Sequence, residues 1–393
     1  MSTAPLPQRA YVWQREWTPA VSAAVKQAPK ELAGLVVFGA EISWHDGKPK
    51  AFRCAIDWAA LRAQPKPVSI ALRIDPWPGP FDSAEITQTL VSQSKALLDR
   101  MSQEHIPCQE LQVDFDCAQK KLPGYTRWLK ALHGAVKPAR LVITALPSWL
   151  EERSLPALLD ETDGWVLQVH SVKPDKAAAH VLTCDPVRAR EWVALAERLH
   201  RPFEAALSTY SAQAGYSPEG KLLSVALDGI QPAWPAGTHI MQFDSDADSL
   251  ASLTNEWRQS HPEALRGLLW YRLPVATDQR NWRAATFAAV VAGRAPTHHL
   301  SVQTEGEMPL DFSVLNDGEA DEDLAKVLIR LTWQGPPPVA SEALPGWTLR
   351  SENGALNFTF NSSQRLPPGT RRSLGWLRFE QPQKVQAEVL SRP

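Results

Sequence analysis

The sequence predicts a (β/α)8 barrel, a TIM barrel of the α/β class, followed by a small antiparallel β-sandwich. Strand-like runs alternate with helical periodicity from residue 8 to about 295, whereas strands follow one another without helices after about 298. A doubly wound open sheet is the alternative, but no glycine-rich phosphate turn follows an early strand. We therefore expect a barrel over residues 1–297 and a sandwich over residues 298–393.

The barrel prediction depends on eight runs rich in β-branched and aromatic residues. The expected strands are 9–17, 32–43, 67–75, 110–117, 139–148, 163–171, 202–210 and 265–274. Helical periodicity fits residues 19–29, 84–104, 121–136, 186–200, 246–259 and 281–293. Thr18 before Pro19 and Asp185 before Pro186 are typical helix starts. Residues 44–66 and 212–243 are expected to be insertions of short strands and turns.

The final segment contains about six short strand-like runs joined by turns such as Asn316-Asp317-Gly318 and Glu352-Asn353-Gly354. A turn of the Asn-Gly type is a strong hairpin signal. This pattern predicts an antiparallel sandwich, which either binds glycan or braces the barrel.

Composition excludes some classes of protein. The 41 basic and 43 acidic residues are interspersed, so we expect no nucleic-acid partner. No apolar run reaches the roughly 18–20 residues of a membrane span. The first residues lack a basic segment followed by an apolar one, so a periplasmic or envelope location is expected only if a leader precedes this sequence, and a cytoplasmic one otherwise. Oligomeric state cannot be read from the composition.

The four cysteines show no zinc-ligand spacing, and we expect neither a metal nor a cofactor. Cys117 and Cys184 follow predicted strands at the same end of the barrel. A disulfide between them is therefore a hypothesis that the sequence allows.

The run "ELQVDFDC" at 110–117 reads as a buried strand that carries two acids. Alternation places Gln112, Asp114 and Asp116 on one face. A buried charge without a partner costs several kcal/mol, so these acids are paired, solvated in a cavity, or catalytic. Barrel active sites lie at the carboxyl ends of the strands, where the inward face of this strand would contribute to the pocket.

The same alternation, applied to the other strands, directs further polar and aromatic side chains into the mouth. In the second strand it points Val36 and Phe38 outward and Gly39 and Glu41 inward. The candidate substrate-binding residues are Arg73, Gln168, His170, Tyr210, Trp270 and Arg272. Five tryptophans at or beyond strand ends are candidates for a sugar platform: Trp17, Trp44, Trp77, Trp149 and Trp270.

Carboxylates around a barrel mouth fit cleavage of a glycosidic bond, which needs one protonated acid and one ionised base or nucleophile. We expect a carbohydrate ligand, with Asp116 and Glu41 as acid and base and with Asp114 tuning Asp116. Arg73 and Asp114 could instead form a buried ion pair without a chemical role. A metal-assisted site of Asp114, Asp116 and His170 is less favoured, because the chain has no compact ligand pair.

Five ordered motifs, "LQVDFDC", "ITALPSWL", "GWVLQVH", "ALSTYS" and "LLWYRLP", resemble the bacterial family called domain of unknown function 3142, over about residues 30–275. This resemblance implies a glycoside-hydrolase-like TIM barrel and leaves the activity open. The Asp-x-Asp at 114–116 also resembles part of the Asp-x-x-Asp-x-Asp-x-Glu signature of chitinase-like barrels. Ala118 stands where that signature has its catalytic Glu, so the chitinase-type mechanism is disfavoured. The chain is then either a glycoside hydrolase with its acid at Asp116 or Glu41, or an inactive barrel that binds glycan.

Overall fold

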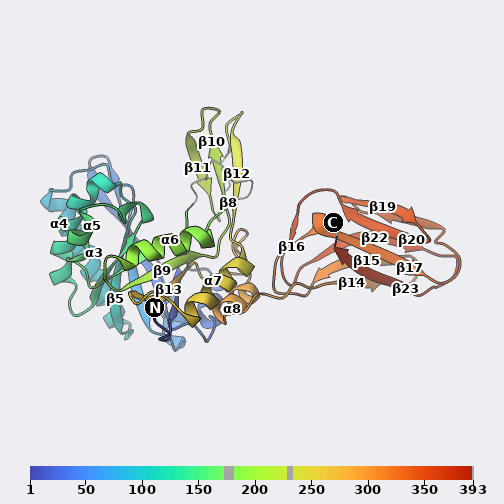
Figure 1. Cartoon of the computed structure of the whole chain (residues 1–393), viewed down its shortest axis with the longest axis horizontal. Coiled ribbons are helices and arrows are strands. Elements are labelled where there is room, and N and C mark those ends of the chain that lie inside the picture. The colour runs from blue at the N-terminus through green and yellow to red at the C-terminus, as the bar shows by residue number, and fades with distance from the viewer. Residues whose placement is uncertain (172–180, 228–232, 392–393) are drawn as a thin grey trace. The chain divides into compact units, whose positions relative to one another are not determined.

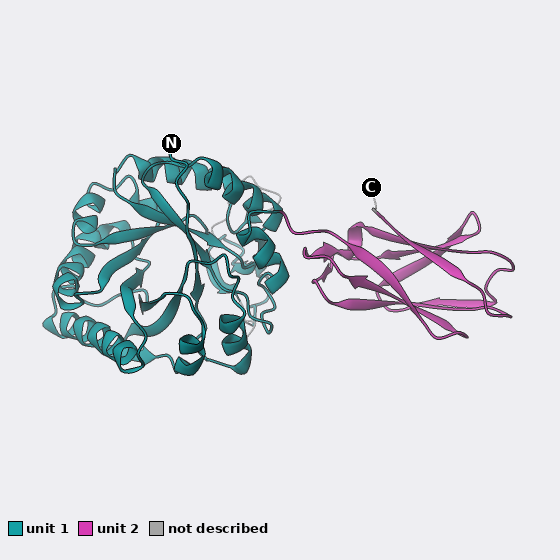
Figure 2. Cartoon of the chain, turned by 90° about the horizontal axis from the view of Figure 1, so that it is seen from below, with its two compact units in different colours: residues 1–294 teal, residues 295–393 magenta. Residues whose placement is uncertain are grey.

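A computed structural model describes residues 1–171, 181–227 and 233–391. The chain divides into two compact units, Met1–Arg294 and Ala295–Pro393, which are coloured separately in Figure 2.

Eight parallel strands form the first unit's barrel. They are β1 (Gln8–Val12), β2 (Gly34–His45), β4 (Val68–Ile74), β5 (Cys108–Phe115), β6 (Arg140–Ala145), β7 (Gly164–Gln168), β9 (Phe203–Ser208) and β13 (Leu265–Tyr271). Neighbours pair in this order, and β1 pairs with both β2 and β13, so the sheet closes on itself. Helices surround the closed sheet in Figure 2. The predicted barrel is confirmed, with all eight strands in the expected places.

The helices follow the strands along the chain. They are α1 (Pro19–Lys26), α2 (Trp58–Ala63), α3 (Ala84–Gln103), α4 (Leu122–Ala135), α5 (Leu155–Leu159), α6 (Pro186–Glu197), α7 (Ala247–Gln259) and α8 (Ala284–Val291). Thr18 and Asp185 cap α1 and α6 by accepting hydrogen bonds from backbone N–H groups, as predicted. The short helices α2 and α5 are absent from the sequence prediction, because one or two turns give little periodicity to detect.

Both predicted insertions contain strands. After β2, the chain turns back as β3 (Lys48–Arg53), which pairs antiparallel with it. Between β9 and β13, the chain forms β10 (Ala212–Tyr216), β11 (Leu222–Ala226) and β12 (His239–Asp244). These strands make a second sheet of order β11, β10, β12, β8, in which β8 (Val181–Leu182) comes from the segment between β7 and β9. This sheet projects from the barrel at the top of Figure 1.

An ion cluster fills the amino-terminal end of the barrel interior. Arg9 of β1 contacts Glu110 of β5 at 2.9 Å and Glu204 of β9 at 2.5 Å, and Arg140 lies 3.7 Å from Glu110. Gly164 on β7 makes room for it, because a Cβ there would lie 2.8 Å from the Arg140 guanidinium. The cluster is largely buried, so each charge depends on its partners.

A mostly apolar layer separates this cluster from the other end of the barrel. Gln112 crosses it, donating to Glu110 at 2.6 Å and accepting from the Tyr11 hydroxyl at 2.7 Å. The apolar members of the layer are Val36, Ala71, Val142, Val166, Ala206 and Leu269.

The second unit contains two four-stranded antiparallel sheets. One has the order β14 (Leu300–Glu305), β15 (Leu310–Asn316), β22 (Arg371–Arg378) and β18 (Ala340–Ala343). The other has the order β19 (Trp347–Glu352), β20 (Ala355–Phe360), β17 (Val327–Trp333) and β23 (Val385–Ser391). Asn353 and Gly354 join β19 to β20 with positive φ angles of 52° and 74°, as the Asn-Gly hairpin prediction requires.

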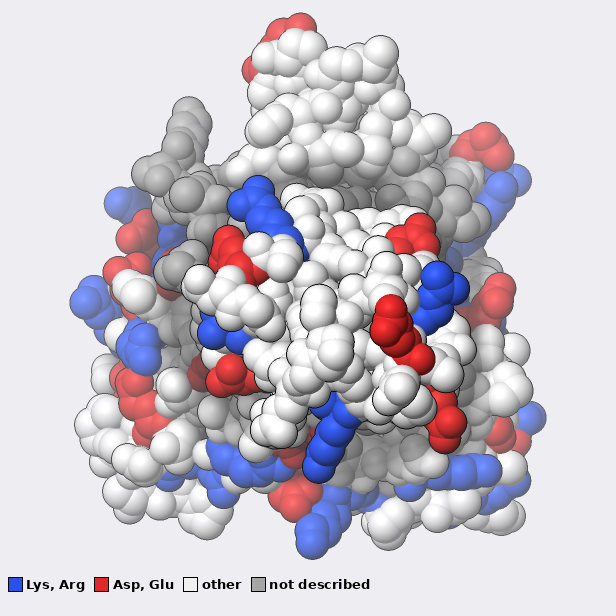
Figure 3. All heavy atoms as spheres, turned by 90° about the vertical axis from the view of Figure 1, so that its right-hand side faces the viewer, with Lys and Arg blue, Asp and Glu red and all other residues white. Residues whose placement is uncertain are grey.

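The structure bears on the expected disulfide and on the expected absence of a membrane span. The hypothesis of a Cys117–Cys184 disulfide is wrong: all four cysteines are free thiols, and Cys184 Sγ lies 3.2 Å from the Val169 carbonyl oxygen. Among the described residues, no helix has the length and apolarity to cross a bilayer. Figure 3 shows basic and acidic side chains interspersed on the face that it presents.

We predict that Arg9→Gln lowers the free energy of unfolding by about 3–5 kcal/mol, because it leaves buried carboxylates without their main cation. Chemical denaturation measures the change. Arg62→Gln is the matched control: it breaks an exposed pair with Glu104, and we expect a loss under about 1 kcal/mol. Equal effects of the two substitutions would contradict the assigned role of the cluster.

Candidate active site

The carboxyl ends of the barrel strands surround a cavity of about 1310 Å³. It is the kind of pocket that barrel enzymes use. Eight of the nine predicted site residues line it: Glu41, Arg73, Asp114, Asp116, Gln168, His170, Tyr210 and Arg272. Trp270 is the exception.

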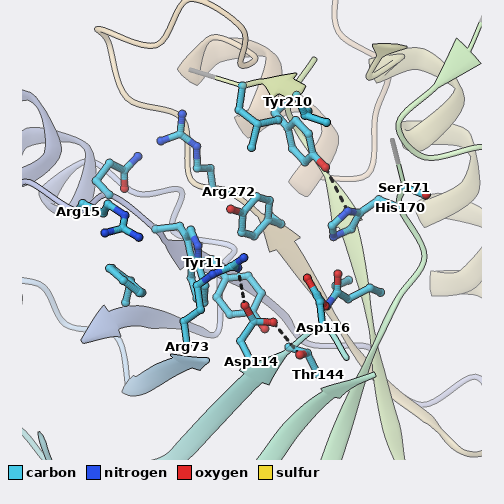
Figure 4. A pocket seen from close by; sticks show the side chains of 18 of the residues that line it. Tyr11, Arg15, Arg73, Asp114, Asp116, Thr144, His170, Ser171, Tyr210 and Arg272 are labelled. Carbon is cyan, nitrogen blue, oxygen red and sulfur yellow. Dashed lines mark hydrogen bonds and ion pairs between the residues drawn. The ribbon is translucent and has the colours of Figure 1, made fainter. Parts of the chain in front are cut away.

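Arg73 of β4 and Asp114 of β5 form an ion pair at the inner end of the cavity (Figure 4). The two residues are register partners, and Arg73 Nη1 lies 2.9 Å from Asp114 Oδ2. Thr144 of β6 donates a hydrogen bond to the other carboxylate oxygen at 2.7 Å. Both oxygens of this buried carboxylate therefore have a partner.

Asp116 lies just beyond the end of β5 and opens into the cavity. It accepts a hydrogen bond from Gln168 Nε2 at 3.0 Å. The Asp116 side chain is exposed to the cavity, but the residues that line the cavity shield it from much of the bulk water. This desolvation, followed by the negative charge of Asp114, raises the pKa of Asp116 from 3.8 to about 6, although Arg73 and Gln168 act in the opposite direction. Asp116 can therefore hold a proton near neutral pH.

Glu41 of β2 is held between two guanidinium groups. Arg15 donates to both of its carboxylate oxygens, and Arg73 Nε lies 3.7 Å from Oε2. Arg15 also lies over the Phe52 ring, 5.4 Å from its centroid. Glu41 is thus held in a fixed orientation where it lines the cavity.

A bulge in β2 turns Glu41 inward. The pairing of β2 with β4 shifts register between Phe38 and Ala40. Before the bulge, Val36 and Phe38 face the interior, so their predicted outward orientation is wrong. Gly39 faces out, where a Cβ would lie 2.9 Å from Leu97 of α3, so its predicted inward orientation is also wrong.

Asp75 follows β4 as Asp116 follows β5. The register pairs Arg73 with Asp114 and Ile74 with Phe115, so the next residues of the two strands, Asp75 and Asp116, occupy neighbouring positions. Asp75 Oδ1 lies 3.5 Å from Arg73 Nε. Both residues line the cavity, one step beyond the ion pair along their strands.

Aromatic rings form another wall of the cavity. His170 stacks on Tyr271, with centroids 5.6 Å apart and planes at 20°, and Tyr210 meets Tyr271 edge-on at 5.5 Å. Trp13 lies 5.7 Å from Tyr271. Burial lowers the pKa of His170 to about 4, so its ring is neutral near neutral pH. The sequence analysis missed Trp13 and Tyr271, because it assigned no inward residues to the first strand and assigned Trp270 in place of Tyr271 to the inward face of β13.

The predicted inward orientation of Trp270 is wrong. Its ring is fully buried against Trp282 and Phe287 outside the barrel, and its Nε1 donates to Gln8 Oε1 at 2.9 Å. Leu269 and Tyr271 take the inward positions of β13. The rest of the predicted platform is also wrong: Trp17, Trp44, Trp77 and Trp149 pack against the barrel core and do not line the cavity.

Polar groups complete the lining. Arg272, just past β13, pairs with Asp278 at 2.9 Å. Gln14 lines the cavity, and neither polar atom of its amide has a hydrogen-bond partner among the described residues. A buried amide in this state is costly unless a ligand or water satisfies it. The described residues contain no group of three His, Cys, Asp or Glu side chains able to hold a metal.

The fold and the site define a TIM barrel with an acidic, aromatic-walled mouth. A family model described as "Domain of unknown function (DUF3142)" matches residues 64–276, and the chain belongs to this family. No curated protein sequence matches it.

The chain is similar to several solved structures, and the first of them shows the same fold. The spore cortex-lytic enzyme SleL of Bacillus cereus has a TM-score of 0.51 at 12% identity, over 74% of each chain. A plant class V chitinase mutant from Cycas revoluta, in complex with (GlcNAc)3, has a TM-score of 0.49 at 11% identity, over 73% of this chain and 98% of that one. A chitinase from Chromobacterium violaceum has a TM-score of 0.47 at 17% identity, over 73% and 98%.

We predict that Asp114→Asn lowers the pKa of Asp116 below about 6, because it removes the neighbouring negative charge. Gln168→Leu should raise that pKa, because it removes a hydrogen bond to the ionised form. Carboxyl-carbon NMR titration measures both shifts. Shifts of the same sign in the two variants would contradict this account of the site.

Proposed function

We propose that this barrel is a glycoside-hydrolase-like enzyme that cleaves a glycosidic bond at its carboxyl-terminal mouth. The observation that carries the proposal is the placement of Asp116, which opens into the cavity two residues beyond the ion-paired Asp114. One carboxyl group that holds a proton and others that stay ionised are what glycoside hydrolysis requires. The fold shared with a spore cortex-lytic enzyme is compatible with this reaction.

In this proposal Asp116 is the general acid. It donates its proton to the leaving-group oxygen, and its pKa near 6 keeps it partly protonated at neutral pH. Glu41, held in place by Arg15 and Arg73, is the second carboxylate, which activates water or attacks the sugar. Asp114 sets the proton affinity of Asp116 and stabilises positive charge that develops on the ring.

The remaining lining suits a sugar. Pyranose rings present flat apolar faces, which stack on aromatic side chains such as Trp13 and Tyr271. Sugar hydroxyls need donors and acceptors, which Gln168, Tyr210 and Arg272 supply around the cavity.

A glycan-binding barrel without catalysis is the second candidate. The observation that favours it is Ala118, at the position of the chitinase-type Glu, which lies outside the cavity lining. Both candidates use the same mouth and differ only in whether Asp116 transfers a proton.

We also propose that residues 298–393 form a β-sandwich accessory domain to the barrel of residues 1–297. Support comes from one apolar core that includes Phe312 and Val314 of one sheet and Ile329 and Phe358 of the other. Its role is either to bind glycan or to brace the barrel.

We predict that Asp116→Asn abolishes hydrolysis in a panel of oligosaccharides while glycan binding and the melting temperature are kept. The amide preserves the shape of the side chain and removes its proton transfer. In the wild type, the rate should fall as pH rises above about 6, because the acid then loses its proton. Reducing-end release and calorimetric binding measure the two properties.

Asp82→Asn is the matched control, since Asp82 lies in the loop after β4, outside the cavity lining. It should leave hydrolysis unchanged. Undiminished hydrolysis by Asp116→Asn would reject the catalytic assignment. Binding without hydrolysis by the wild type would favour the glycan-binding barrel.

A further inference from the structure

Carboxylates outnumber cations in the cavity. The described part of its lining contains three arginines, which are Arg15, Arg73 and Arg272. It contains six acids, which are Glu16, Glu41, Asp75, Asp114, Asp116 and Asp278. Lysine is absent from this part of the lining. The site therefore presents a negative potential to whatever enters it.

Each arginine already has a carboxylate partner. Arg15 pairs with Glu41, Arg73 with Asp114 and Arg272 with Asp278. Three acids have no arginine of their own, because Asp75 shares Arg73 with Asp114. Glu16 is exposed at the rim, whereas Asp75 and Asp116 are the neighbouring carboxylates at the ends of β4 and β5.

This carboxylate pair is poorly compensated. Asp75 shares Arg73 with Asp114. Arg73 lies 3.5 Å from the Asp75 carboxylate but 2.9 Å from that of Asp114. Asp116 has a neutral amide, Gln168, as its hydrogen-bond partner. Negative charge in a partly desolvated cavity is unfavourable, as the effect of Asp114 on the pKa of Asp116 shows, and a bound cation would offset it.

The aromatic wall adds a second attraction for a cation. The faces of Trp13, Tyr210 and Tyr271 carry the negative side of the ring quadrupole, and all three rings line the same cavity. Aromatic rings alone would suit a neutral sugar. Rings together with surplus carboxylates suit a sugar that carries a positive charge.

We infer that the glycan taken by this site carries free, protonated amino groups, and that Asp75, beside Asp116, binds one of these ammonium groups. The substrate class is thus an amino-sugar polymer without N-acetyl groups at the bound residue. An ammonium group carries three N–H donors, and the Asp75 carboxylate accepts a charge-assisted hydrogen bond from it. This inference depends on the proposed function, because it names the substrate of the same cavity.

The test uses three β-1,4-linked oligosaccharides of equal length, built from glucosamine, N-acetylglucosamine or glucose. They differ only in the group at C2. Calorimetry with the full chain, at one mildly acidic pH at which the amino groups of glucosamine are protonated, measures each affinity. We expect the glucosamine oligomer to bind roughly tenfold to a hundredfold more tightly than the glucose oligomer, as a charge-assisted hydrogen bond supplies.

Asp75→Asn should leave the affinity for the glucose oligomer unchanged. It should lower the affinity for the glucosamine oligomer to the same value. Asp82→Asn removes the same charge in the same βα loop, outside the cavity lining, and should keep the preference. A loss of preference in both variants would assign it to general electrostatics and overturn the inference.

The remaining outcomes separate the two proposals. Binding of all three oligomers with equal affinity would overturn the inference and leave the proposed function standing. Tighter binding of the N-acetylated oligomer would do the same. Binding of none of them would count against the proposed function itself.

Discussion

The ion pair between Arg73 and Asp114 is the interaction on which the mouth of this barrel depends. Arg73 lies 2.9 Å from Asp114, 3.5 Å from Asp75 and 3.7 Å from Glu41, so one guanidinium group serves three carboxylates from three adjacent strands. It also lowers the pKa of Asp116 without contacting it closely. Desolvation and the negative charge of Asp114 outweigh this effect, so the pKa of Asp116 stays raised. The chemistry proposed for Asp116 is a consequence of that balance.

The interior of the barrel separates this reactive end from a structural one. At the amino-terminal end, charges are matched: Arg9 and Arg140 face Glu110 and Glu204, and a glycine on β7 leaves them room. An apolar layer follows, and the mouth beyond it holds unmatched charge. Buried ion pairs fill space at little net gain in stability, whereas unmatched acids have a cost that only function or a ligand explains. The same residue types therefore have different meanings at the two ends.

The sequence predicted the barrel strands and eight of the nine site residues at the cavity, because strand alternation is a local property of the backbone. It failed where pairing between strands decides the orientation. Glu41 does face inward, as predicted, but the alternation used to predict it is wrong for Val36, Phe38 and Gly39. Glu41 faces inward because β2 has a bulge at Gly39. Trp270 was assigned to the wrong face because the parity of β13 is set by its neighbours β1 and β9. No local pattern marks either feature.

The tryptophans explain why the aromatic wall was also missed. Tryptophans just after a strand were predicted to form a sugar platform. Loop residues at these positions instead fold back onto the core, as Trp77 and Trp149 do. Trp13 and Tyr271 reach the cavity instead, because they continue the inward rows of Tyr11 and Leu269. In a barrel, an aromatic ring reaches the ligand when its residue belongs to the inward-facing row of a strand. Its distance from the strand end matters less. By the same rule, Asp116 continues the inward row of Asp114 just beyond β5, and Asp75 continues that of Arg73 just beyond β4. Both acids therefore line the same cavity as the aromatic rings.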